Sequence, residues 1–118
     1  MRRLFIAAGC ALAFAASTTS ADAYYPYGAI ASSANFAYGY AGDQVSELRA
    51  DAVALVNCRA RTHFACAVRV WWGGAGVCGA LARNGGRQGW GFGRGSARAR
   101  LNALHGAGGG YILVTACN

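Results

Sequence analysis

The sequence YGAIA at Tyr27–Ala31 returns as CGALA at Cys78–Ala82, 51 residues later in the chain. A second pair, YGY at Tyr38–Tyr40 and WGF at Trp90–Phe92, repeats at a spacing of 52 residues. We interpret both pairs as one repeat with a single inserted residue. In each half, the YGY or WGF segment is followed by a helix-like stretch and then by an apolar run rich in β-forming residues. The pattern therefore predicts a strand–strand–helix–strand unit that is used twice.

Two helices are expected, one in each unit. The first starts at an Asp43 N-cap and ends near Asn57, and the second starts at Ser96 and stops at Gly106. Apolar residues share one side of the first helix at helical spacing: Val45, Leu48, Ala52, Leu55 and Val56. A unit of about 40 residues cannot bury its own apolar face. We therefore expect a single small α+β domain, with two helices packed on one antiparallel or mixed sheet.

Four cysteines lie within the repeats and a fifth, Cys10, precedes them. Cys58 and Cys66 bracket the turn after the first helix, so a bond between them would fasten that turn. Cys78 opens the second unit and Cys117 closes it, so their pairing would tie the last strand to the middle one. Four cysteines allow three pairings, and the sequence favours this one without excluding the others.

The first residues resemble a secretion signal. Arg2 and Arg3 precede an apolar run from Leu4 to Ala16, and Ala21–Ala23 fits a small-x-small cleavage site. The arginine pair also loosely resembles a twin-arginine signal. We expect residues 1–23 to be removed, leaving residues 24–118 as a secreted or periplasmic domain with four cysteines and no transmembrane segment. An even number of cysteines in an oxidising compartment favours two disulfides over metal ligation, and no cofactor is expected.

These residues resemble a family of small exported bacterial proteins, the domain of unknown function 4189 family of mycobacteria and proteobacteria. The resemblance is carried by Tyr27–Ala31, by Cys58 and Cys66, by Cys78–Ala82, and by Ala116–Asn118. It implies export and a shared cysteine framework, but no established activity and no catalytic residues.

Charge is distributed unevenly between the two units. The expected mature chain has nine arginines and three acids, a net charge of +6, and five of the arginines lie after residue 77, where no acid occurs. We predict a basic binding surface formed by Arg83, Arg87, Arg94, Arg98 and Arg100. Its partner would be a protein or another anionic partner. Nucleic acid is an option that we do not favour. Solubility, with salt bridges from Arg98 or Arg100 to the acidic first helix, is the alternative role of these charges.

Aromatic residues alternate with glycine and alanine in the expected strands. Phe36, Tyr38 and Tyr40 share one strand face, as do Trp90 and Phe92. We expect these aromatic residues to face inward as core. The alternative places the small residues beneath the helices and leaves the aromatics, including Trp90 and Phe92, as an open platform for binding or for a homodimer.

An enzyme needs a constellation of reactive groups, and few are present. The candidates for an exported hydrolase are Glu47, Asp51 and His63. Glu47 and Asp51 are four residues apart and so lie on one helix face, which is typical of a solvated surface. His63 lies in a basic loop between Cys58 and Cys66. We therefore favour a secreted, non-enzymatic binding protein, with the hydrolase as the alternative if the three groups converge in a cleft.

Overall fold

A computed structural model describes residues 25–118 of the protein. The expected signal peptide, residues 1–23, and its cleavage site lie outside the described residues. The chain runs through the first unit as β1 (Tyr27–Ser33), β2 (Tyr38–Gln44), α2 (Glu47–Arg59) and β3 (Cys66–Gly73). It runs through the second as β4 (Val77–Asn84), β5 (Arg87–Arg94), α3 (Ser96–Ala107) and β6 (Tyr111–Cys117). The predicted order of strand, strand, helix and strand therefore occurs twice.

The strands form two antiparallel three-stranded sheets, in the orders β2-β1-β3 and β5-β4-β6. The α+β class and the doubled unit are confirmed, but the six strands do not join into the one sheet that was expected. β1 and β4 are central strands, and each pairs on both sides with strands of its own half. Neither central strand has an edge left to join the halves, so the halves meet face to face instead.

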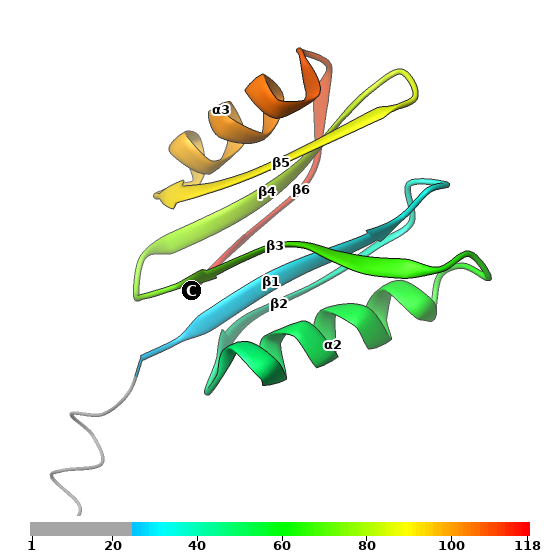
Figure 1. Ribbon diagram of the computed structural model, residues 1–118. Helices are drawn as coiled ribbons and strands as arrows, with labels where there is room; N and C mark the ends of the chain where they lie inside the picture. Colours follow the sequence, from blue (N-terminus) through cyan, green and yellow to red (C-terminus); the bar gives the residue numbers. More distant parts are fainter. Residues whose placement is uncertain (1–24) are drawn as a thin grey trace, which may run out of the picture.

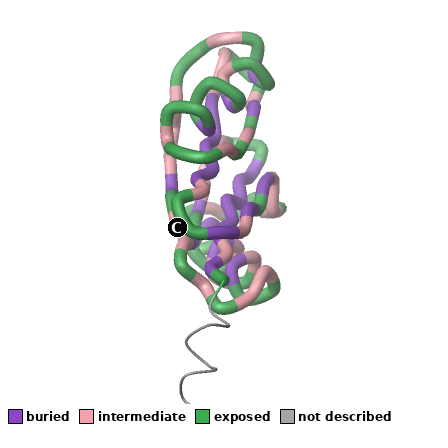
Figure 2. Tube along the Cα trace, turned by 90° about the vertical axis from the view of Figure 1, so that its left-hand side faces the viewer, coloured by how far each residue is buried: buried purple, intermediate pink, exposed green. Residues whose placement is uncertain are grey.

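The molecule has four layers, with α3, its sheet, the second sheet and α2 following one another (Figure 1). Between the sheets lies a core built from Ile30, Val70, Trp72, Leu81 and Ala116. The buried segments run through the strands of this interior, and the outer turns of the helices are exposed (Figure 2). Apolar residues on the inner faces of both sheets therefore hold the two repeats together.

Glycine and alanine fill the spaces between each helix and its sheet. A Cβ atom added at Gly39 would lie 2.3 Å from the backbone nitrogen of Cys58, and one added at Gly89 would lie 2.1 Å from that of Ala107. The buried helix residues are Ala50, Ala54 and Cys58 in α2 and Ala99, Ala103 and Ala107 in α3. Each helix backbone therefore packs almost directly on a strand.

This close packing determines which helix face is exposed. Alanine and cysteine occupy the closest contacts, so Leu48 and Val56 of α2 point outward, and Leu48 is 79% exposed, whereas Leu55 packs at the edge of this core. Val45 precedes the N-cap of the helix and is also exposed. The apolar spacing in the first helix therefore does not mark its buried side. Helix boundaries also differ from expectation. Ser46 is the N-cap of α2, its Oγ accepting a hydrogen bond from the N–H of Arg49 at 3.1 Å, and α3 continues to Ala107 before Gly108 ends it in a left-handed conformation.

Strand pairing corrects the alignment of the two repeats. Ile30 pairs with Tyr40 in the first sheet, and Leu81, the counterpart of Ile30, pairs with Trp90 in the second. Tyr40 is therefore equivalent to Trp90, at a spacing of 50 residues rather than the 52 that the YGY and WGF match indicated. The turn between β1 and β2 is longer than the Gly85–Gly86 turn between β4 and β5. The spacing between equivalent residues therefore falls after the first strand of each repeat, whereas the sequence match indicated that it rises.

Trp72 lies at the centre of the interface between the sheets. Its side chain is 1% exposed, and it packs between Gly28 of its own sheet and Gly79 of the other. Its counterpart in the second repeat is Ala116, because Gly28 pairs with Trp72 as Gly79 pairs with Ala116. The indole of Trp72 therefore fills the interface between the sheets, and the equivalent position of the second repeat carries only the methyl group of Ala116.

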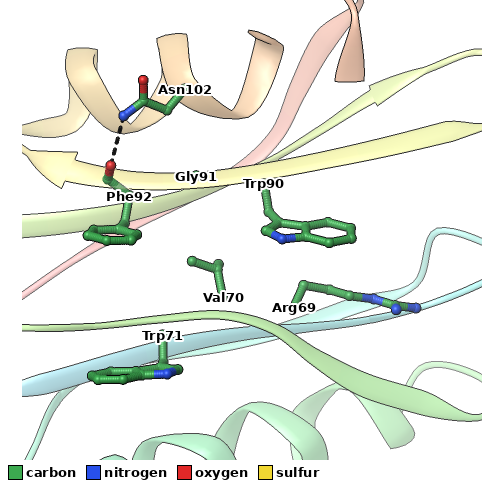
Figure 3. A pocket seen from close by; sticks show the side chains of 7 residues that line it. All are labelled: Arg69, Val70, Trp71, Trp90, Gly91, Phe92 and Asn102. Atoms are coloured by element: carbon green, nitrogen blue, oxygen red, sulfur yellow. Dashed lines mark hydrogen bonds between the residues drawn. The ribbon is translucent and has the colours of Figure 1, made fainter. Parts of the chain in front are cut away.

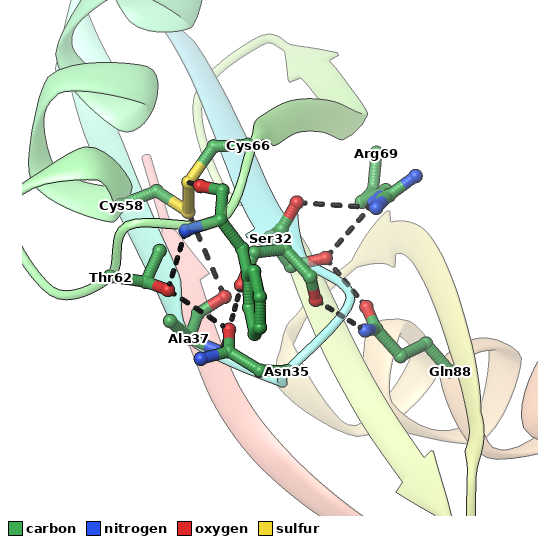
Figure 4. The surroundings of a disulfide bond; sticks show 10 residues. Ser32, Asn35, Ala37, Cys58, Thr62, Cys66, Arg69 and Gln88 are labelled. Carbon is green, nitrogen blue, oxygen red and sulfur yellow. Dashed lines mark hydrogen bonds between the residues drawn. A yellow bond between two sulfur atoms is a disulfide. The ribbon is translucent and has the colours of Figure 1, made fainter.

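Both favoured disulfides are present in the structure. Cys58 is joined to Cys66, and Cys78 is joined to Cys117. The first bond links the end of α2 to the start of β3 (Figure 4). The second joins paired residues of β4 and β6. Each repeat is thus closed by one covalent bond at a different place.

Candidate binding groove

An open groove runs along one side of the sandwich, where the edge strands β3 and β5 of the two sheets come together. It has a volume of about 490 Å³. The lining residues are Arg69, Val70, Trp71, Trp90, Gly91, Phe92 and Asn102 (Figure 3). We call this feature the β3–β5 groove.

Two aromatic side chains project into the groove from β5. Trp90 and Phe92 point from β5 toward β3 (Figure 3), and they are 42% and 55% exposed. The glycines that alternate with them face α3, where a side chain would collide with the helix. Because small residues lie beneath the helix, the aromatics take the opposite face, which corrects the expectation that they form core. At this edge of the sheet they remain open to solvent.

Arg69 supplies the cationic group of the groove. It lies at an irregularity in the pairing of β1 with β3, between the positions that pair with Ile30 and Ala31. Its Nε and Nη2 donate hydrogen bonds to the Oγ and carbonyl oxygen of Ser32 at 3.0 and 3.2 Å (Figure 4). Its guanidinium carbon lies 5.7 Å from the centre of the Trp90 ring, within the range of a cation–π contact.

A buried polar network fixes this arginine. The Oγ of Ser32 donates a hydrogen bond to Oε1 of Gln88, and Nε2 of Gln88 donates one to the carbonyl of Ser33 at 2.8 Å (Figure 4). Ser32 and Ser33 are fully buried. The network joins β1 and β3 of one sheet to β5 of the other, so it holds Arg69 and Trp90 in a fixed relation.

Asn102 of α3 closes the upper edge of the groove. Its Nδ2 donates a hydrogen bond of 2.9 Å to the carbonyl oxygen of Phe92 (Figure 3). In the other repeat, Nδ2 of Asn57 donates to the carbonyl of Tyr40 at 3.2 Å. Each helix therefore covers an edge carbonyl of its sheet, which protects that edge from pairing with another strand.

On the opposite side of the sandwich, between β2 and β6, other residue types occupy the positions equivalent to those that line the groove. Strand pairing makes Leu113 the counterpart of Arg69 and Thr115 the counterpart of Trp71. The place of Phe92 is taken by an irregular stretch at Gly42 and Asp43. A Cβ added at Gly42 would lie 2.7 Å from the Cys117 carbonyl oxygen, and the N–H of Asp43 donates to Oδ1 of Asn118 at 3.0 Å.

The duplicated scaffold is therefore asymmetric. One side is closed by contacts of Gly42 and Asp43 with Cys117 and Asn118. The other side is open and carries an arginine and two large aromatic side chains, Trp90 and Phe92. Because both sides derive from the same repeat pattern, the fold alone does not require Arg69, Trp90 and Phe92 at these positions.

The predicted basic residues do not form one cluster. Arg83 stacks on Phe36 of the other repeat, with its guanidinium carbon 3.7 Å from the ring centre. Arg87 and Arg94 lie at opposite ends of β5. Arg98 lies along β5, where its side chain covers Gly93. Arg100 is on the other flank of α3, because Ala99 between them faces the sheet. The acidic helix α2 is on the far side of the sandwich, so Arg98 and Arg100 form no salt bridges with it (Figure 1).

Sequence reasoning found Trp90 and Phe92 but missed Arg69, Trp71 and Asn102. Arg69 lies in the half that is nearly neutral overall, so charge distribution directed attention away from it. Trp71 lies next to Trp72, and alternation required only that the two point to opposite faces. A search for an arginine adjoining an aromatic pair would have found the segment Arg69–Trp72.

The candidate catalytic residues are not brought together. Glu47 and Asp51 lie in the first turns of α2, whereas His63 lies in the loop beyond the other end of that helix. Glu47 and Arg59, the two ends of the 13-residue helix, lie about 18 Å apart along its axis. Oδ1 of Asp51 is buried without a hydrogen-bond partner, and desolvation raises the pKa of its carboxyl group above the ordinary 3.8. His63 is exposed beside Asn35 and Phe64.

Residues 25–118 hold neither a metal-binding cluster nor a membrane-spanning helix. Within that part of the chain, no group of three or more histidine, cysteine or acidic residues is arranged to hold a metal ion. The helices of this part are also not long and apolar enough to cross a membrane.

Comparisons with known proteins place the chain in a family. The NMR structure of Rv1813c from Mycobacterium tuberculosis is similar, with 34% sequence identity, a TM-score of 0.61, and coverage of 79% of this chain and 75% of that one. No curated protein matches the sequence. The family model described as domain of unknown function (DUF4189) matches residues 27–117, which include both repeats and both disulfides. The protein therefore belongs to the DUF4189 family.

Proposed function

We propose that the protein is an exported, non-enzymatic binding protein that engages a protein or other anionic partner through the β3–β5 groove and the basic residues beside it. The observation that carries the proposal is the asymmetry of the duplicated scaffold. Only one of two equivalent sides combines an arginine with half-exposed Trp90 and Phe92. Tryptophan and arginine are the residue types that contribute most to protein–protein binding.

The charge around the groove supports an anionic partner. Arg69 lies within it, and Arg94 and Arg98 lie at the end of β5 and along its flank. No acid occurs after residue 77, and the acids of the described residues, Asp43, Glu47 and Asp51, belong to β2 and α2. An anion approaching this side therefore meets a positive potential.

Export is supported by two independent features. The first residues have the layout of a cleaved signal, and removing residues 1–23 would also remove the fifth cysteine, Cys10, and leave an even number. The four remaining cysteines form two disulfides, which persist mainly in oxidising compartments.

The experiment is chromatography of the oxidised mature domain on immobilised heparin and polyglutamate, eluted with a salt gradient. The test variant carries Arg94→Gln and Arg98→Gln, and the control carries Arg59→Gln and Arg100→Gln, which remove the same charge far from the groove. We expect the test variant to elute at clearly lower salt than the control. Equal elution of the two variants would show that retention depends on net charge alone.

A further inference from the structure

The β3–β5 groove has features that indicate the kind of partner it fits. Its aromatic side chains are half-exposed and line an open surface between two strands, rather than an enclosed cavity. Small-molecule sites usually bury about 70–90% of their ligand. Half-covered tryptophan and phenylalanine beside an arginine are instead typical of a protein-binding surface.

The edge of β5 is poorly suited to pairing with an added strand. Asn102 already occupies the carbonyl of Phe92, and Gly106 of α3 lies against the backbone of Trp90. A segment bound along β5 would therefore be held mainly by its side chains.

Side-chain contacts in the groove fall into two kinds. Val70 lies between the strands, and Trp90 and Phe92 lie on the facing side (Figure 3). Together these three side chains form an apolar place, or subsite, that can accept one large side chain. Arg69 lies at one end of this apolar place and Arg98 lies on the flank of β5 beyond Phe92. The Arg69 Nε and Nη2 atoms are held by Ser32, so the group is pre-oriented and needs little ordering when a carboxylate binds.

We propose that the groove binds an acidic protein segment through one large apolar side chain placed on Val70 between Trp90 and Phe92, with carboxylates of the segment on Arg69 and Arg98. This inference rests on the proposed function, because it assumes that the groove is the binding site. It adds the chemistry of the partner, which charge complementarity with the basic groove specifies.

The test is selection of random 12-residue peptides displayed on phage against the oxidised mature domain. Parallel selections use Trp90→Ala and the matched control Tyr40→Ala, which alters the equivalent position on the closed side of the sandwich. We expect peptides that are enriched on the wild type and on Tyr40→Ala but lost on Trp90→Ala. These peptides should combine an aromatic or large aliphatic residue with several acids.

The outcomes separate the two proposals. Enrichment of neutral or basic peptides that depends on Trp90 would overturn the acidic partner while leaving the groove as a binding site. Enrichment that is equal on all three proteins, or no enrichment at all, would overturn both.

Affinity measurements with a synthetic acidic peptide containing one central phenylalanine then test the residue roles. We expect Phe92→Ala and Trp90→Ala to weaken binding by at least about tenfold. Arg69→Leu, which introduces the residue of the equivalent Leu113 position, should weaken the acidic peptide but not its glutamine counterpart. Arg61→Leu is the control, because Arg61 makes a similar contact with Tyr38, at 5.3 Å, outside the groove. Equal losses for the acidic and glutamine peptides would overturn the role of Arg69.

Discussion

The contact between Trp72 and Gly79 can be tested by adding a single methyl group. A Cβ at position 79 would lie 2.1 Å from Cζ3 and 2.3 Å from Cε3 of Trp72. Carbon atoms in contact are ordinarily about 3.5–4.0 Å apart, so the ring would have to move by more than about 1 Å. It has no room to do so, because a Cβ at Gly28 on the other side would itself lie 2.4 Å from the ring.

We therefore expect Gly79→Ala to lower the free energy of unfolding by about 3 kcal/mol, at the upper end of overpacking effects. Trp72→Ala should cost about 3–5 kcal/mol through loss of a fully buried ring. In the Trp72→Ala background, however, Gly79→Ala should be almost neutral, because the three atoms nearest to the added methyl group all belong to the indole ring. The coupling free energy between the two positions should thus be about 2–3 kcal/mol.

Urea denaturation followed by circular dichroism, with the disulfides intact, measures these differences. Gly86→Ala is the control, since a Cβ there would meet no atom within 4 Å, and it should change stability by less than about 1 kcal/mol. If Gly79→Ala cost as much without the indole as with it, Trp72 would not be the cause of the requirement for glycine.

Three further predictions concern stability. Cys117→Ser should lower the melting temperature more than Cys66→Ser, because the loop-entropy contributions are about 4 and about 2.5 kcal/mol for the longer and shorter loops; the reverse order would contradict this ranking. Asp51→Asn should raise the melting temperature at neutral pH, because a carboxyl whose folded pKa is raised destabilises the fold when ionised. The difference between the variant and the wild type should disappear as the pH falls through the raised pKa and Asp51 becomes protonated. A variant no more stable than the wild type at neutral pH would refute the destabilising effect of ionised Asp51. Asn118→Ala should cost about 2–3 kcal/mol in urea denaturation, because its side chain bonds to the Pro26 and Gly74 carbonyls and the Asp43 N–H; a loss below about 0.5 kcal/mol would show that water replaces these bonds.

Local patterns in the sequence predicted the element order and the disulfides. The YGAIA and CGALA matches fall on the two central strands, where glycine and alanine are required by packing on both faces. Cysteine positions at element ends identified the pairs that the fold brings together.

The division into two sheets could not be read from the sequence, because it depends on which strands pair. The same apolar alternation in β1 and β4 suits a wide single sheet and two stacked sheets equally well. The buried side of α2 was missed for a related reason. A stripe containing Leu48 and Val56 normally marks the core side of a helix. Gly39, however, lets α2 lie so close to β2 that the fully buried residues of the helix are Ala50, Ala54 and Cys58.

The groove was predicted only in part, since it joins residues from both repeats. Trp90 and Phe92 were identified from their strand, but Arg69 reaches Trp90 only because the sheets stack with β3 beside β5. Charge counted along the chain favoured five arginines of the second repeat. In space those arginines are dispersed over β4, β5 and both flanks of α3.

The NMR signals of the tryptophan indoles test most directly whether the β3–β5 groove is the binding surface. The sequence has three tryptophans, so a proton–nitrogen NMR spectrum of the mature domain should show three indole N–H signals. On titration with the acidic phenylalanine-containing peptide, we expect the Trp90 signal to move, together with the backbone amides of Arg69 and Phe92. The signal of buried Trp72 should remain in place, as should the amides of Tyr40 and Thr115 on the closed side. Shifts centred on Tyr40 and Thr115, or no shift at Trp90 when the peptide is bound, would show that the groove is not the binding surface.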